Sequence, residues 1–166
     1  MKTYYFLITL LLVSCKQKQL FEFDKINHYQ ISLSEDEESN LYDLTNKSHA
    51  DSLYNIILNQ DEPISLNDTG FLNSLKLPKI KMNQINDNKL AEFRLLFKEK
   101  ISWKTNYKCE PIYRDVLIFQ NNDKVNGIAK ICFECNKYYM IGTIGDDSSF
   151  GTEKDFKTLK HLLVNK

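Results

Sequence analysis

The sequence predicts an α+β fold, a single domain in which about four helices pack on a small antiparallel meander of three to four strands. Two observations support this class. The C-terminal half holds three apolar or alternating segments separated by short polar turns, which is typical of consecutive antiparallel strands. Elsewhere, apolar residues recur at helical spacing. A chain of 166 residues is long enough for one domain with a sizeable core.

The first elements of the domain are predicted to be a short strand and a helix. Tyr29, Ile31 and Leu33 alternate with polar residues, which is the pattern of a half-buried strand. The acidic run over residues 34–38 follows directly. Ser34 can cap a helix at this point, and early acidic side chains complement the helix dipole. We therefore interpret the run as a solvated helix start.

Two helices are predicted in the middle of the chain, on either side of a loop-rich stretch over residues 61–78. The first spans residues 48–59, with Ser48 as its N-cap. The second spans residues 87–101 and has the clearest pattern, because apolar residues recur there at i, i+3, i+7 and i+11.

Three strands and a last helix are predicted at the C-terminal end. The strands span residues 113–120, 125–133 and 138–144, and short polar turns separate them. The first of these is apolar on both faces, so we expect it to be covered on both sides. Thr152 and Asp155 form a capping-box-like pair at the start of the last helix.

The N-terminal segment has the pattern of an export signal followed by a lipidation site. A basic start and a short apolar run lead into Leu12-Val13-Ser14-Cys15. This pattern resembles the lipobox of bacterial lipoprotein precursors. The apolar run is too short to span a bilayer, which needs about 20 residues, but it suits a signal-peptide core. The resemblance implies that residues 1–14 are a signal peptide removed after Ser14, and that Cys15 is lipidated.

The lipobox also implies a place in the cell. Residues 15–27 are expected to be the lipidated cysteine and a tether, and residues 28–166 the single α+β domain. Two or three acyl chains would hold this domain firmly on a membrane. Lys16 does not fit the Asp signal for inner-membrane retention, and no acidic residues directly follow the cysteine for surface export. We therefore expect an outer-membrane lipoprotein of the bacterial cell envelope that faces the periplasm.

Charge and motifs exclude several classes of function. The full chain has 22 basic and 22 acidic side chains, and loss of the signal peptide removes only Lys2, which leaves 21 against 22. Nucleic-acid binders usually carry a basic excess, so we expect no nucleic-acid partner. The sequence contains no nucleophile elbow, phosphate loop or zinc-protease motif. We therefore predict that the protein is not an enzyme.

Three cysteines remain in the body of the chain: Cys109, Cys132 and Cys135. If Gln120 pairs with Val125, the meander brings all three to one end of the sheet. An exported protein favours a disulfide there, between Cys109 and either of the other two. Closing a loop of about 25 residues would add on the order of 3 kcal/mol of stability.

A metal site and unpaired thiols are the alternatives for this cysteine cluster. Cys132 and Cys135 have the spacing of a zinc knuckle, and Cys109 could supply a third thiolate. A fourth ligand would have to come from a carboxylate or from one of the histidines, which otherwise stand alone in the sequence: His28, His49 and His161. A thioredoxin-like redox motif is less favoured, because that chemistry places Cys-x-x-Cys at a helix N-terminus and this pair ends a strand.

Two segments of the body carry a second resemblance. Residues 113–119 (YRDVLIF) and 129–135 (AKICFEC) are similar to a group of small uncharacterised lipoproteins from Bacteroidota. The resemblance covers roughly the C-terminal half of the chain. It implies no activity, so it brings no catalytic residues.

Three roles are compatible with the sequence. A lipid-anchored, non-enzymatic binding or accessory module, with another envelope protein as a candidate partner, predicts an exposed apolar or aromatic patch and no deep polar cleft. A metal-binding or thiol-redox lipoprotein predicts that the three sulfurs of the cluster approach each other beside a fourth ligand, with zinc as the candidate cofactor. A hydrolytic enzyme predicts a pocket of convergent titratable groups. The first role, which needs no cofactor, is favoured because no catalytic signature is found.

Overall fold

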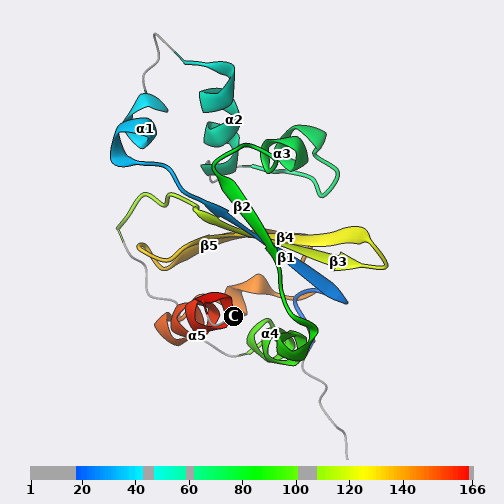
Figure 1. Ribbon diagram of the computed structural model, residues 1–166. Helices are drawn as coiled ribbons and strands as arrows, with labels where there is room; N and C mark the ends of the chain where they lie inside the picture. The colour runs from blue at the N-terminus through cyan, green and yellow to red at the C-terminus, as the bar shows by residue number, and fades with distance from the viewer. Residues whose placement is uncertain (1–17, 43–46, 59–61, 101–107, 165–166) are drawn as a thin grey trace, which may run out of the picture.

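The computed structural model describes residues 18–42, 47–58, 62–100 and 108–164, which form three layers (Figure 1). An antiparallel sheet lies in the middle, and helices cover both of its faces. Its described strands follow the order β2-β1-β3-β4-β5. In chain order they are β1 (Lys25–Ile31), β2 (Ile80–Gln84), β3 (Asp115–Asn121), β4 (Lys124–Cys132) and β5 (Lys137–Ile141).

The predicted α+β class is confirmed, although the sheet has five described strands and not three to four. Helices α1, α2 and α3 lie on one face of the sheet, and α4 and α5 lie on the other (Figure 1). The helices are α1 (Glu35–Asn40), α2 (His49–Leu58), α3 (Thr69–Ser74), α4 (Leu90–Leu96) and α5 (Glu153–Val164), with 3-10 turns η1 (Asp87–Lys89) and η2 (Asp147–Ser149). No helix in these ranges is long and apolar enough to cross a membrane.

The predicted helix starts are confirmed by their capping bonds. Ser34 and Glu37 form a complete capping box at α1. At α2, the backbone N–H of Asp51 donates to Oγ of Ser48 over 3.1 Å, and the carboxylate of Asp51 accepts from the backbone of Ser48. Such reciprocal bonds satisfy backbone groups that a helix end leaves without partners. The predicted Thr152–Asp155 pair makes the same two bonds at α5.

Each face of the sheet has its own hydrophobic core. The core under α4 and α5 is rich in phenylalanine, and Phe21 stacks on Phe119 with ring centroids 4.2 Å apart. The core under α1, α2 and α3 is mostly aliphatic. Leu20 and Phe21 are buried in the first core, so the folded body begins earlier than the predicted boundary at residue 28.

Two sequence predictions fail between residues 61 and 101. The loop-rich stretch contains helix α3, and strand β2 follows it where no element was predicted. The helix predicted over residues 87–101 begins as a 3-10 turn and ends at Leu96, because Phe97 leaves the helical conformation at φ −92° and ψ 41°. Phe97 still packs in the core, which explains why apolar spacing continued past the helix end. Ile101 lies outside the described residues.

The predicted pairing of β3 with β4 holds only beside the turn that joins these two strands. Gln120 does pair with Val125, but an irregularity between Phe119 and Gln120 shifts the register by one residue. Asp115 therefore faces Ile131 and not Lys130. The chain before β3 nevertheless reaches the β4–β5 turn, where Cys109 is bonded to Cys135.

Candidate functional site: a polar groove beside helix α5

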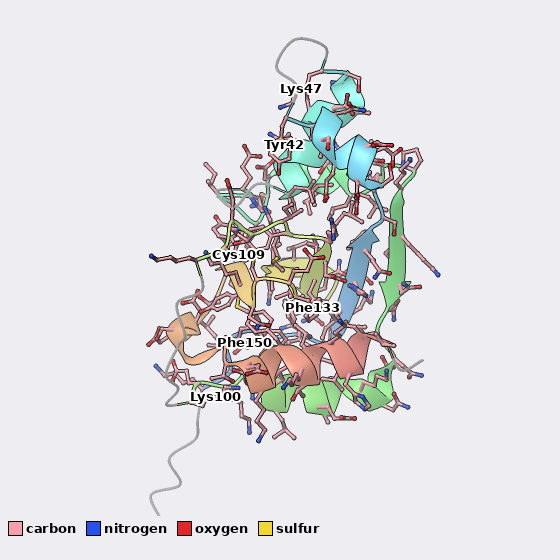
Figure 2. The ribbon with its side chains drawn as sticks, turned by 90° about the vertical axis from the view of Figure 1, so that its left-hand side faces the viewer. Tyr42, Lys47, Lys100, Cys109, Phe133 and Phe150 are labelled. Atoms are coloured by element: carbon pink, nitrogen blue, oxygen red, sulfur yellow. A yellow bond between two sulfur atoms is a disulfide. The ribbon has the colours of Figure 1, made fainter. Side chains whose placement is uncertain are left out.

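The predicted convergence of the three cysteines is confirmed, and one disulfide forms. Cys109 and Cys135 are bonded, with Cα atoms 5.7 Å apart and a sequence separation of 26. Cys132 is a buried free thiol in the same small hydrophobic cluster as Cys135. Figure 2 shows Cys109 beside the sheet, away from α5. The disulfide ties the chain that enters β3 to the β4–β5 turn.

This arrangement leaves little for a metal to bind. Two of the three sulfurs are in the disulfide and are not thiolates. Across the four described ranges, no group of three His, Cys, Asp or Glu side chains could hold a metal ion. His49 begins α2 and His161 lies in α5, each on a different face of the sheet from the other. In this structure two of the three cysteines cross-link the fold.

His28 does not stand alone, which corrects the sequence prediction. Its Nε2 donates to Oδ1 of Asp115 over 2.7 Å. The two side chains are 6% and 12% exposed, so the pair is almost fully removed from water. The sequence could not place them together, because 87 residues separate them. A buried polar pair of this kind costs desolvation energy that the hydrogen bond only partly returns.

Strand pairing explains how the two side chains meet. His28 on β1 lies opposite Leu117 of β3, and Asp115 is two residues further along the same face of β3. Side chains two residues apart on neighbouring strands are within reach of each other. Leu117 belongs to the core under α4 and α5, so His28 and Asp115 lie on that face too. They lie at the border of that apolar core.

Two adjoining hollows open at this point, between the β1–β2 side of the sheet and the C-terminal half of α5. Their volumes are about 470 Å³ and about 410 Å³, and both are lined by His28, Asn83 and Leu163. We call the two hollows together the His28 groove. Figure 2 shows Phe133, which lines one of them, between the sheet and α5. The remaining lining residues are Gln30, Lys81, Gln84, Ile85, Asn86, Asn88, Lys89, Asp115, Lys160, Leu162 and Val164.

The groove has an excess of positive charge. Three lysines line it, Lys81, Lys89 and Lys160, whereas Asp115 is its one carboxylate. Asp115 is already engaged by His28. Among the described residues, neither Lys81 nor Lys160 has a carboxylate partner, and Nζ of Lys89 donates to the backbone O of Leu162 over 2.9 Å. Lys160 also lies 6.0 Å from the ring centre of Phe133.

Lys130 on β4 is also buried, but its ammonium group makes its contacts within the protein and away from the groove. Its Nζ donates to the backbone O of Glu62 over 2.6 Å and lies over the rings of Tyr113 and Tyr139, at 4.9 and 5.6 Å from their centres. These contacts satisfy the ammonium group within the protein. Lys130 lines neither hollow of the groove. We therefore assign it to the fold.

The His28 groove bears on the roles considered from sequence. It is a polar cleft, whereas the binding-module hypothesis predicted none, and it holds the convergent titratable groups that a hydrolytic enzyme would need. However, none of the residues that line it carries a hydroxyl or a thiol. A covalent mechanism would therefore lack a nucleophile there. Large apolar side chains that are exposed come from separate segments of the chain: Tyr42, Ile64, Met82, Leu95, Ile144 and Val164.

Comparison of the chain with family models, with curated proteins and with solved structures finds no significant match.

Replacement of the buried pair tests whether it serves the fold. Asp115→Leu alone leaves His28 without its partner, and we expect a loss of about 1–3 kcal/mol in the free energy of unfolding. His28→Phe combined with Asp115→Leu should restore most of that loss, since buried polar pairs are often replaced by apolar residues at no cost. Denaturant titration of the wild type, both single variants and the double variant measures the coupling. A double variant whose loss equals the sum of the two single losses would show no energetic coupling and contradict the His28–Asp115 hydrogen bond.

Proposed function

We propose that the protein is a lipid-anchored binding module of the bacterial cell envelope, and that the His28 groove is its recognition site. The observation that carries this proposal is the buried His28–Asp115 pair: His28 lines both hollows and Asp115 lines the smaller one. Apolar side chains would pack this part of the core at lower cost. A polar pair retained at such a cost, beside a cleft, favours a functional role.

The anchor is supported by the lipobox and by where the body begins. Lys18 is the first described residue, and its backbone O accepts from the backbone N–H of Glu99 over 2.8 Å. Leu20 is already buried. Only residues 16 and 17 lie between Cys15 and the described body, so an acylated Cys15 would hold the domain close to the membrane surface.

Lipidation is tested by replacing Cys15 with serine. We expect the wild type to sediment with membranes and to incorporate an alkyne-tagged fatty acid, and we expect Cys15→Ser to lose all of the label. The physical reason is that the Cys15 thiol is the acylation site, and a body without acyl chains has no comparable hold on a bilayer. Cys132→Ala is the matched control, because it removes a buried thiol and should keep the label. Labelled, membrane-bound Cys15→Ser would contradict the anchor.

A hydrolytic role is the second candidate, because a histidine oriented by a carboxylate can act as a general base on water. His28 and Asp115 have this relation at 2.7 Å. The absence of a hydroxyl or thiol among the lining residues makes binding the stronger proposal. Hydrolysis of p-nitrophenyl acetate by the wild type, lost in His28→Phe and retained in His161→Phe, would reverse this order. Equal background rates in all three proteins would support the binding role.

A further inference from the structure

We infer that the His28 groove takes a small polyhydroxylated anion, of the class of a sugar acid or a sugar phosphate. This inference rests on the proposed function, because it assigns a ligand class to the same groove. Three independent features of the lining residues support it: their charge, their hydrogen-bonding groups and the one aromatic ring among them.

The charge favours an anion. Lys81 and Lys160 extend from opposite walls, β2 and α5, and both line the hollow that contains Asp115. Because the carboxylate of Asp115 is engaged by His28, it does not neutralise either lysine. Two unpaired ammonium groups across a cleft attract a carboxylate or a phosphate, and such charge-assisted hydrogen bonds are about twice as strong as neutral ones.

The hydrogen-bonding groups favour hydroxyls. Five primary amides line the groove, and each offers two N–H donors and one carbonyl acceptor. Within the part of the chain that is described, the side-chain amides of Gln30, Asn83 and Gln84 are not engaged by other residues. Hydroxyl groups both donate and accept, so a polyol satisfies such a set fully. The five amides are those of Gln30, Asn83, Gln84, Asn86 and Asn88.

Register places these groups in rows on one face of the sheet. Asp115, Gln30 and Lys81 lie side by side across β3, β1 and β2, because Gln30 pairs with both of the others. In the next row, His28 lies opposite Asn83. A ligand on this surface would therefore meet an ammonium, an amide and an imidazole at adjacent positions. The strands are rigid supports, which suits recognition of a small ligand.

The size and the apolar side of the groove fit the same ligand class. Each hollow, at about 470 or 410 Å³, lies within the range of about 300–1,000 Å³ that is usual for small-ligand sites. Phe133 is half-buried in the wall, and its ring could pack against the C–H face of a sugar ring. Leu163 and Val164 extend this apolar side from α5.

Isothermal titration of the full, acylated protein in detergent micelles tests the inference. The probes are glucuronate, glucose 6-phosphate and glucose, which share a ring and differ in charge. We expect both anions to bind and glucose to bind at least about tenfold more weakly, since it lacks the charge-assisted contacts. Stronger binding of one anion than of the other distinguishes a sugar acid from a sugar phosphate.

Variants show whether binding takes place in the groove. Lys81→Ala and Lys160→Ala should each weaken binding of the anions by about tenfold. Lys124→Ala is the matched control, because Lys124 is an exposed lysine at the far end of β4 and should leave the affinity unchanged. Equal affinities for glucose and the anions would overturn the anion assignment but leave the groove as a binding site. Anion binding that ignores both groove lysines would overturn the groove as well, and binding of no probe would overturn the assigned ligand class.

Discussion

Replacement of Phe97 with alanine is expected to lower the free energy of unfolding by about 3–5 kcal/mol, the usual cost of removing a buried aromatic side chain. Phe97 is fully buried and follows directly after α4. Its ring lies 5.8 Å from Phe21, 5.1 Å from Phe119 and 5.0 Å from Phe150, measured between centroids. It therefore joins the N-terminal segment, the central strand β3 and the chain that leads into α5.

Leu95→Ala is the matched control for Phe97→Ala, because Leu95 lies in the last turn of α4, two residues before Phe97, and is 64% exposed. We expect it to change stability by no more than about 0.5 kcal/mol. Denaturant titration followed by circular dichroism measures both variants. Equal losses in the two variants would contradict the position assigned to Phe97. Since domains are stable by only about 5–15 kcal/mol, the Phe97 variant should also lose a large part of its folded population on heating.

Removal of the Cys109–Cys135 disulfide is the second large effect. With a sequence separation of 26 between the two cysteines, loop-closure entropy predicts a loss of about 3 kcal/mol when both are replaced by alanine. The physical cause lies mainly in the unfolded chain, which gains freedom when the cross-link is absent. Thermal unfolding of the double variant, and of the wild type with and without reductant, measures the loss. The reduced wild type should match the double variant.

Cys132→Ala controls for the loss of a thiol as such. It keeps the disulfide, so we expect it to remain sensitive to reductant, unlike the double variant. The intact mass of the wild type, purified without chelator or reductant, should be two hydrogens below that of the reduced chain. A stoichiometric metal adduct in place of this deficit would contradict the disulfide and return the cysteine cluster to a metal site.

Sequence patterns sufficed where an element buries one regular face. The strands of the meander and the last helix have strong periodicity and clear turn or capping residues, so their existence followed from local physics. The same logic located the N-caps Ser34 and Ser48 and the Thr152–Asp155 capping pair. It also brought the cysteines together, because a short turn fixes which strands are neighbours.

Local sequence patterns did not predict the elements whose position or end depends on tertiary contacts. Strand β2 is short and largely polar. Among the described strands it lies at the edge of the sheet and pairs only with β1, and one of its faces borders the groove. Such an edge strand carries little hydrophobic signal. Helix α4 ends where Phe97 turns into the core, and periodicity could not distinguish this from a helix that continues. The register irregularity after Phe119 likewise could not be predicted from the residues of the turn.

The candidate site was missed for a related reason. His28 and Asp115 come from strands that are adjacent in the sheet but far apart in sequence, and the wall of the groove draws on β1, β2 and α5. One local signal existed. His28 follows Ile26 on the inward face of β1, where an apolar residue would be expected, and a polar residue at such a position calls for a partner.

The most direct test of the account is to locate a ligand on the protein. A ¹H–¹⁵N spectrum of the isotope-labelled protein, titrated with glucuronate, reports which backbone amides respond. We predict shifts confined to the segments around His28, Asn83 and Leu163, which line both hollows of the groove. Shifts centred instead on the Cys109–Cys135 disulfide, or on the face covered by α1 and α2, would contradict the groove as the recognition site.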